Sequence, residues 1–122
     1  MIHYSQQAID NCDINEVAKI LRSDFITTGP TVSLFEKSIS KKVKSKFAVA
    51  TNSATSALHI SCLALGLKAN DWVWTSPNSF VASSNSAIYC GAKIDFVDID
   101  PKTFNLSATK LGDKLKKTKK NR

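Results

Sequence analysis

Short apolar runs alternate with helical patterns along this chain of 122 residues, and this alternation constrains the fold more than any other feature. The expected strands cover residues 47–50, 72–75 and 93–99. The expected helices that separate and follow them cover residues 56–67, 81–89 and 106–117. The runs are short and mostly apolar, as in strands that are covered on both faces of a sheet. Their order predicts two βαβ units with right-handed crossovers, and therefore an α/β fold in which helices flank a parallel sheet.

Two more helices are expected before the first strand. Apolar residues at helical spacing predict one over residues 13–22, with Asp13 as its N-cap and Glu16 at the capping-box position. The turn Thr27-Thr28-Gly29-Pro30 ends this pattern, and a second helix is predicted over residues 32–43. The chain then divides into a helical segment at 1–46, a βαβαβ part at 47–117 and a basic tail at 118–122.

Composition excludes several classes of protein. The chain is 43% hydrophobic and 22% charged, which is ordinary for a globular domain. No apolar run reaches the roughly 18 residues of a membrane-spanning helix. The N-terminus has neither the basic nor the apolar part of a secretory signal. Three widely spaced cysteines indicate unpaired thiols in a reducing cytoplasm rather than a disulfide framework or a zinc site.

The net charge of +7 is concentrated at one end of the chain. Residues 110–122 carry six of these seven net charges, so the rest of the chain is nearly neutral. A basic run of this kind can bind nucleic acid or another polyanion without sequence specificity. No aromatic residues interleave with the lysines to stack on bases, so we expect no nucleic-acid partner, and a solvated helix end is the simpler interpretation.

Two polar clusters follow expected strands, at the edge of a parallel sheet where ligands bind. The first is Thr51–Ser56, at the start of an expected helix. The N–H groups and dipole of that helix could bind a phosphate, with hydroxyls from Thr55 and Ser56 and room for the anion beside Ala54. The same residue types are preferred as N-caps, so capping alone is the simpler interpretation. Neither a dinucleotide-binding glycine motif nor a P-loop is present.

The second cluster, Ser76–Ser79, is followed by Phe80. The ring of Phe80 could offer a flat face to a ring-shaped ligand between the two clusters. An ordinary core phenylalanine explains the same pattern, and from the spacing alone it is the simpler interpretation. Asp95, Asp98 and Asp100 form a group of carboxylates, but alternation along a strand and the turn at Asp100-Pro101 favour structural roles, so no metal site is predicted.

Four stretches together resemble the N-terminal part of the DegT/DnrJ/StrS family of pyridoxal-phosphate (PLP)-dependent enzymes. They are HYSQQAIDNCDINEVAKIL, FITTGPTVSLFEKSIS, NSATSALHISCLALGL and DWVWTSPNSFVASSNSAIYCGAKIDFVDIDPKTFNL. They occur in the family's order, and the resemblance runs from about Tyr4 to Leu111. It implies the N-terminal part of the large domain of a fold-type-I PLP-dependent transferase, a parallel sheet flanked by helices.

The resemblance also implies site residues. Thr55 and Ser56 would hold the cofactor phosphate, and Phe80 would stack on the pyridine ring. The positions that would line the sugar-nucleotide pocket are Tyr4, Asp24, Phe25, Ile26, Thr27 and Ala54. Residues 1–46 would thus carry a substrate loop, and residues 47–117 would form part of the PLP-binding domain.

The implied activity is transfer of an amino group, from glutamate, to a UDP-4-keto-6-deoxy sugar in pseudaminic acid or related cell-surface sugar biosynthesis. The implied enzyme is a cytoplasmic homodimer. The family's Schiff-base lysine lies in an S-F-H-x-x-K-like motif that these 122 residues lack. We therefore expect no catalytic residue in the chain, no activity by itself, and a truncation near residues 118–122. The alternatives are part of a PLP-dependent sugar dehydratase, or a small α/β binding module with a polyanion-binding tail.

Overall fold

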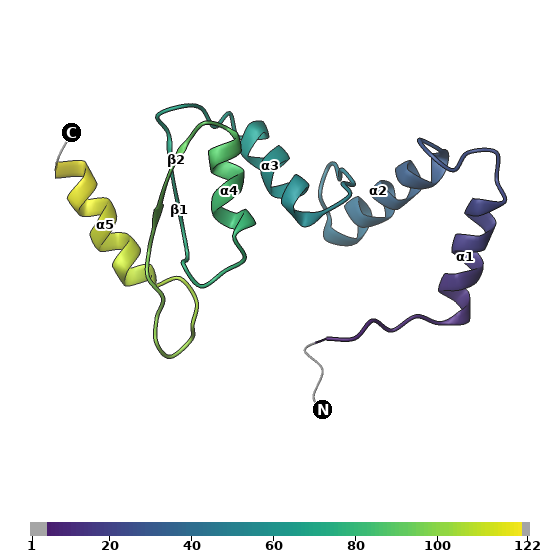
Figure 1. Ribbon diagram of the computed structural model, residues 1–122, viewed down its shortest axis with the longest axis horizontal. Coiled ribbons are helices and arrows are strands. Elements are labelled where there is room, and N and C mark those ends of the chain that lie inside the picture. Colours follow the sequence, from purple (N-terminus) through teal and green to yellow (C-terminus); the bar gives the residue numbers. More distant parts are fainter. Residues whose placement is uncertain (1–4, 121–122) are drawn as a thin grey trace. The chain divides into compact units, whose positions relative to one another are not determined.

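The computed structural model describes residues 5–120 and forms two compact units, which meet in the sequence between Ala50 and Thr51 (Figure 1). The first unit contains the helices α1 (Asn11–Leu21) and α2 (Pro30–Val43). The second unit contains three helices and two strands. In chain order they are α3 (Ala54–Ala64), β1 (Trp72–Thr75), α4 (Ala82–Tyr89), β2 (Lys93–Phe96) and α5 (Ala108–Lys120).

Helix α1 begins with a capping box one turn earlier than predicted. The Asp10 carboxylate accepts the N–H groups of Cys12 at 2.7 Å and Asp13 at 3.0 Å, and Asp13 accepts the N–H of Asp10 at 3.1 Å. The prediction of Asp13 as N-cap with Glu16 as its partner is therefore wrong. Acidic residues three positions apart occur twice here, as Asp10 with Asp13 and as Asp13 with Glu16, so the sequence allows either pair to form the capping box. The structure uses the first pair, with Asp10 as the N-cap.

Helix α2 begins at Pro30, whose fixed backbone angle suits the first turn. The helix ends at Val43, and its C-cap residue Lys44 has a left-handed backbone (φ 55°). The following residues 47–50 form no strand, so this part of the fold prediction is wrong. The N–H of Ala50 instead donates to the Glu36 carboxylate at 2.8 Å. An apolar run becomes a strand only beside a partner, and residues 47–50 pair with neither β1 nor β2.

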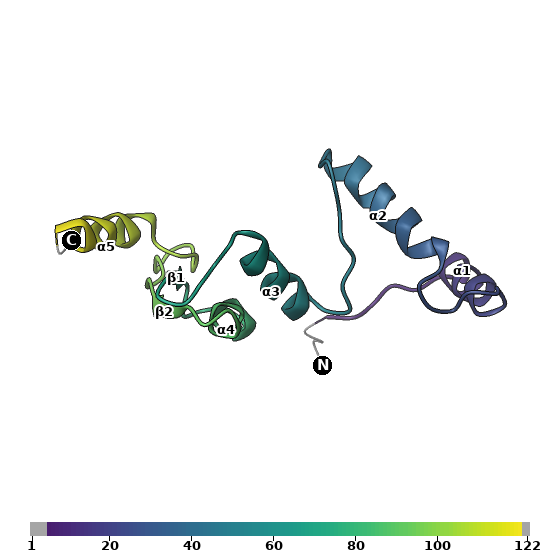
Figure 2. The same cartoon turned by 90° about the horizontal axis from the view of Figure 1, so that it is seen from above.

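The second unit is built on one βαβ unit rather than the predicted two. Strands β1 and β2 pair in parallel, from Trp72 opposite Lys93 to Thr75 opposite Phe96. Helix α4 makes the crossover and packs on both strands and on α3. Figures 1 and 2 show α4 and α5 on opposite sides of the strand pair. The predicted last strand shortens to Lys93–Phe96, and Ile99 forms an isolated antiparallel bridge with Leu106.

Small residues form the core of the second unit. The buried apolar side chains of the described chain are Ala82, Ala87, Ala92 and Val97. On α4, the buried hydroxyls of Ser84 and Ser86 donate back to the carbonyls of Val81 and Ser83, so they leave no unpaired donor. Small side chains let α4 approach its neighbours closely. Among the described residues, no helix has both the length and the apolar character needed to cross a membrane.

We expect a larger side chain in this closely packed core to destabilise the fold. Ala87 is fully buried on α4, so Ala87→Leu should lower the free energy of unfolding by about 1–3 kcal/mol through overpacking. Ala64→Leu, at the exposed end of α3, is the matched control and should change it by less than about 0.5 kcal/mol. Urea unfolding of the two variants measures the difference, and equal midpoints would contradict this account of the core.

Candidate functional site

Ser53 is the N-cap of α3. Its Oγ accepts the N–H of Ser56 at 3.1 Å, and its carbonyl accepts the N–H of Ala57 at 3.1 Å. The capping interpretation of this cluster is thus confirmed. Sequence reasoning did not single out Ser53, although a serine three residues before Ser56 is a recognisable capping signal.

The cap by Ser53 leaves other backbone N–H donors at this helix end without an acceptor. The first four N–H groups of a helix have no intrahelical acceptor, and Ser53 satisfies the N–H of Ser56 alone. The N–H groups of Ala54 and Thr55 have no acceptor within the described part of the chain. Two free N–H groups at the positive end of a helix dipole form the kind of site that binds phosphate.

The hydroxyls of the cluster differ in their availability. Ser56 Oγ donates to Asn52 Oδ1 at 2.8 Å and lies 3.0 Å from Ser53 Oγ. Thr55 is a half-buried residue, and its hydroxyl has no hydrogen-bond partner among the described residues. Thr55 is therefore the free hydroxyl donor, whereas Ser56 is oriented by Asn52. Two N–H groups and one hydroxyl, all neutral donors, fit the phosphate of PLP chemically.

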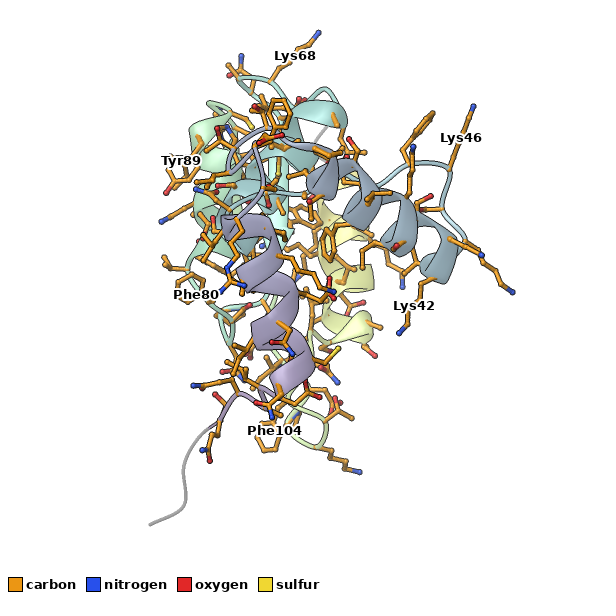
Figure 3. All side chains as sticks on the ribbon, turned by 90° about the vertical axis from the view of Figure 1, so that its right-hand side faces the viewer. Lys42, Lys46, Lys68, Phe80, Tyr89 and Phe104 are labelled. Carbon is orange, nitrogen blue, oxygen red and sulfur yellow. The ribbon has the colours of Figure 1, made fainter. Side chains whose placement is uncertain are left out.

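Phe80 lies outside the core. Its side chain is 74% exposed and projects from the loop before α4, so the core interpretation is wrong (Figure 3). The loop itself is ordered by polar contacts: Ser76 Oγ accepts the N–H of Asn78 at 3.2 Å, and the hydroxyls of Ser79 and Ser83 lie 3.1 Å apart. An exposed ring on an ordered loop is available for stacking.

The predicted substrate residues fall in both units. Asp24 and Phe25 line a hollow of about 420 Å³ in the first unit, whereas Ile26 and Thr27 do not line it. The Cβ of Phe25 lies 2.8 Å from where a Cβ on Gly29 would stand, so the turn needs glycine at that position. Ala54 is exposed at the start of α3 in the second unit. Tyr4 lies outside the described residues.

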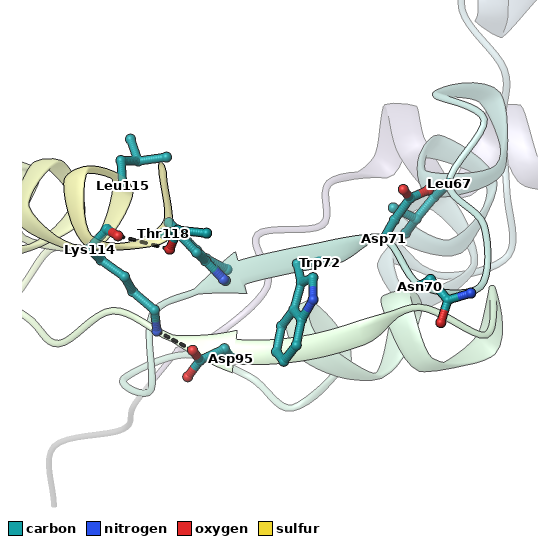
Figure 4. Close-up of a pocket in the computed structure, with 9 residues that line it drawn as sticks. Leu67, Asn70, Asp71, Trp72, Asp95, Lys114, Leu115 and Thr118 are labelled. Atoms are coloured by element: carbon teal, nitrogen blue, oxygen red, sulfur yellow. Dashed lines mark hydrogen bonds and ion pairs between the residues drawn. The ribbon is translucent and has the colours of Figure 1, made fainter. Parts of the chain in front are cut away.

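A larger hollow, of about 760 Å³, lies between α5 and the strand pair (Figure 4). Lys114 of α5 is ion-paired with Asp95, donates to the Phe96 carbonyl at 2.7 Å and lies 5.0 Å from the centre of the Trp74 ring. Lys110 pairs with Asp98 at 2.6 Å. These contacts hold two of the lysines of the basic end against the body of the unit, which favours a structural role for them over polyanion binding.

Hydrogen bonds also account for the three neighbouring carboxylates, Asp95, Asp98 and Asp100. The hydrogen bond from Lys114 lowers the pKa of Asp95, and the hydrogen bond from Lys110 lowers that of Asp98. The N–H groups of Lys102 and Thr103 lower the pKa of Asp100. Each carboxylate thus has its own partner. No group of three or more potential ligands that could hold a metal ion occurs among residues 5–120.

Comparison with known proteins gives the family. The model of the DegT/DnrJ/EryC1/StrS aminotransferase family matches residues 7–121. The chain belongs to this family. The chain is similar to a protein of Campylobacter jejuni, strain 81-176, named UDP-4-amino-4,6-dideoxy-N-acetyl-beta-L-altrosamine transaminase. That protein is 43% identical over 81% of this chain and 26% of its own length. SpsC of Bacillus subtilis, named a spore coat polysaccharide biosynthesis protein, is 41% identical over 88% of this chain and 28% of its own length.

Solved structures of aminotransferases and related proteins share the fold. Spr1654 of Streptococcus pneumoniae, in its PLP form, superimposes with a TM-score of 0.85 and 32% identity over 92% of this chain and 29% of its own. NtdA of Bacillus subtilis, with the cofactor PMP bound, has a TM-score of 0.77 and is 33% identical over 86% of this chain and 25% of its own. The predicted fold class is confirmed as the N-terminal part of the α/β fold of PLP-dependent aminotransferases. The chain spans between a quarter and a third of the length of these relatives.

The lowered pKa values of these carboxylates predict that the fold becomes less stable at acidic pH. A depressed pKa gives stability that is present above about pH 4, the ordinary value for aspartate, and is lost as the pH falls through the folded-state value. Asp95→Asn should therefore unfold more easily than the wild type at neutral pH, and this difference should shrink on acidification. Urea midpoints measured across pH test this, with the exposed Asp113→Asn as control. A constant difference at all pH values would contradict it.

Proposed function

We propose that this chain forms the cofactor-phosphate and substrate-loop part of a PLP-dependent aminotransferase. The enzyme would transfer an amino group, from glutamate, to a UDP-4-keto-6-deoxy sugar in pseudaminic acid or related cell-surface sugar biosynthesis. It would act as a cytoplasmic homodimer. The observation that carries the proposal is the pair of free N–H groups, on Ala54 and Thr55, at the start of α3. The name of the Campylobacter relative supports the sugar nucleotide as substrate.

Helix α3 would bind the cofactor through its phosphate. The N–H groups of Ala54 and Thr55 and the hydroxyl of Thr55 would each donate to a phosphate oxygen. Ser53 keeps the first turn in place by capping Ser56, and Asn52 fixes the hydroxyl of Ser56. The donors are therefore preorganised, which reduces the entropy lost on binding.

Phe80 would cover one face of the pyridine ring. Once bound, PLP supplies the electron-withdrawing ring that amino-group transfer requires. An aromatic side chain excludes water from that face and restrains the tilt of the ring. The exposure of Phe80 and its position directly before α4 support this role.

The proposed contacts to the sugar nucleotide come from the turn at 24–27 in the first unit, from Ala54 in the second unit and from Tyr4, which lies outside the described residues. We assign them to Tyr4, Asp24, Phe25, Ile26, Thr27 and Ala54. The hollow that Asp24 and Phe25 line supports the assignment of these two residues. Phe25 offers an exposed aromatic face, and Asp24 offers an acceptor for hydroxyl or N–H groups.

We assign no catalytic residue to this chain. Amino-group transfer requires a lysine that binds the cofactor and moves a proton. Lys110 and Lys114 are held by Asp98 and Asp95, and no lysine of these 122 residues occurs in an S-F-H-x-x-K-like motif. The chain by itself should therefore be inactive. Borohydride treatment with PLP should trap no single lysine stoichiometrically, and one such adduct would overturn this assignment.

The phosphate site can be tested with pyridoxamine phosphate, which has no aldehyde to react with exposed lysines. Thr55→Val removes one donor to a charged group and should weaken binding about tenfold. Ser61→Ala is the control, because this hydroxyl is also on α3 but donates to the Ala57 carbonyl. Equilibrium dialysis measures both. Equal affinity of the chain for pyridoxamine, which lacks the phosphate, would contradict the proposal.

The ring contact has a matched pair of variants. Phe80 and Phe104 are both exposed phenylalanines of the second unit, at 74% and 64%. Phe80→Ala should weaken binding of pyridoxamine phosphate about three- to tenfold through lost stacking, and Phe104→Ala should leave it unchanged. The same dialysis experiment gives both values. Similar losses in the two variants would show that Phe80 has no specific role.

A further inference from the structure

Two half-buried thiols lie where α3 packs on α4. Cys62 is in the last part of α3, and Cys90 is the residue that caps the C-terminal end of α4. The two helices are in direct contact. The proposed function uses neither thiol. The third cysteine, Cys12, is exposed and belongs to the first unit.

An aromatic contact between α3 and α4 lies close in sequence to both cysteines. The rings of His59 and Tyr89 meet edge to face, with their centres 5.4 Å apart. Cys62 follows His59 by three residues, so it lies on the same face of α3, one turn further along. Cys90 directly follows Tyr89. Burial raises the pKa of the Cys90 thiol, and the neighbouring Cys62 raises it further, as expected for two thiols close together.

We propose that Cys62 and Cys90 are a reversible modification site, at which an intramolecular disulfide joins α3 to α4. The oxidant is a small-molecule disulfide such as oxidised glutathione. One protein thiolate attacks a sulfur of that disulfide, forms a mixed disulfide and releases one glutathione thiol. The second protein thiolate then attacks the bound sulfur and releases the second glutathione. The two cysteines lose two electrons and two protons, and the small disulfide gains them.

The bond would stabilise the part of the chain that carries the cluster at the start of α3. It closes a loop of roughly 30 residues, which lowers the entropy of the unfolded chain. It also joins the helix that begins at the free N–H groups of Ala54 and Thr55 to the helix that follows Phe80. In a reducing compartment such a bond forms transiently, so it would respond to oxidative conditions rather than act as a permanent crosslink.

Peptide mapping of the whole 122-residue chain tests the proposal. The chain is incubated with oxidised glutathione, unfolded, alkylated at its remaining thiols, digested without reduction and analysed by mass spectrometry. We expect a linked peptide pair that contains Cys62 and Cys90, and we expect it to disappear on reduction. Linkage of Cys12 to either residue, separate glutathione adducts on Cys62 and Cys90, or unreacted thiols at both would overturn the proposal.

Variants separate this bond from other thiol reactions. Cys12→Ser should keep the linked pair, whereas Cys62→Ser and Cys90→Ser should each lose it and leave a glutathione adduct on the remaining partner. Oxidation of Cys12→Ser should raise its thermal midpoint by about 10 °C. An unchanged or lower midpoint would show that the bond does not fit the native contact between α3 and α4. If a variant fails to fold, the peptide mapping of the wild-type chain still tests the proposal.

Discussion

The parallel pairing of β1 and β2 determines how the second unit is organised. Its register places Trp72 opposite Lys93 and Trp74 opposite Asp95, so these four side chains share one face of the strand pair. Helix α5 packs on that face through Lys114, which contacts both Asp95 and Trp74. A shift of one residue in either strand would turn these side chains to the other face and remove the contacts of α5.

Helix α4 connects the strand pair to the candidate site. Parallel strands require a crossover, and the small buried residues Ala82, Ser86 and Ala87 let this crossover lie close to its neighbours. The first turn of α4 also follows directly after Phe80, and α4 packs on α3, whose own first turn carries the free N–H groups. The two parts of the proposed cofactor site therefore belong to neighbouring helices of one unit.

Local signals in the sequence predicted the local features of this structure. The position of α3 and its polar first turn follow from capping residues beside an apolar helical pattern, and Gly66 and Gly91 mark helix ends by their positive φ angles. The fold class followed from the order of the elements. The motifs that indicated the family also indicated PLP, the cofactor of related structures, and the chain's own donors at α3 are chemically suited to it.

Features that depend on distant partners could not be predicted in this way. Residues 47–50 have the composition of a strand, but composition does not say whether a partner strand is present. The pairing of Lys114 with Asp95 joins residues far apart in the chain, so the basic end looked free in the sequence. Phe80 is as hydrophobic as a core residue, and only the surrounding structure shows that it is exposed. The choice of Asp10 over Asp13 as N-cap required the hydrogen bonds themselves.

In the proposed function, the first turn of α3 binds the cofactor phosphate. An NMR titration of the ¹⁵N-labelled chain with pyridoxamine phosphate, and separately with pyridoxamine, follows this binding residue by residue. The amide signals of Ala54 and Thr55 should shift more than any others, and they should do so with the phosphorylated compound alone. Shifts confined to the amides of α5, or equal shifts with both compounds, would contradict this proposal.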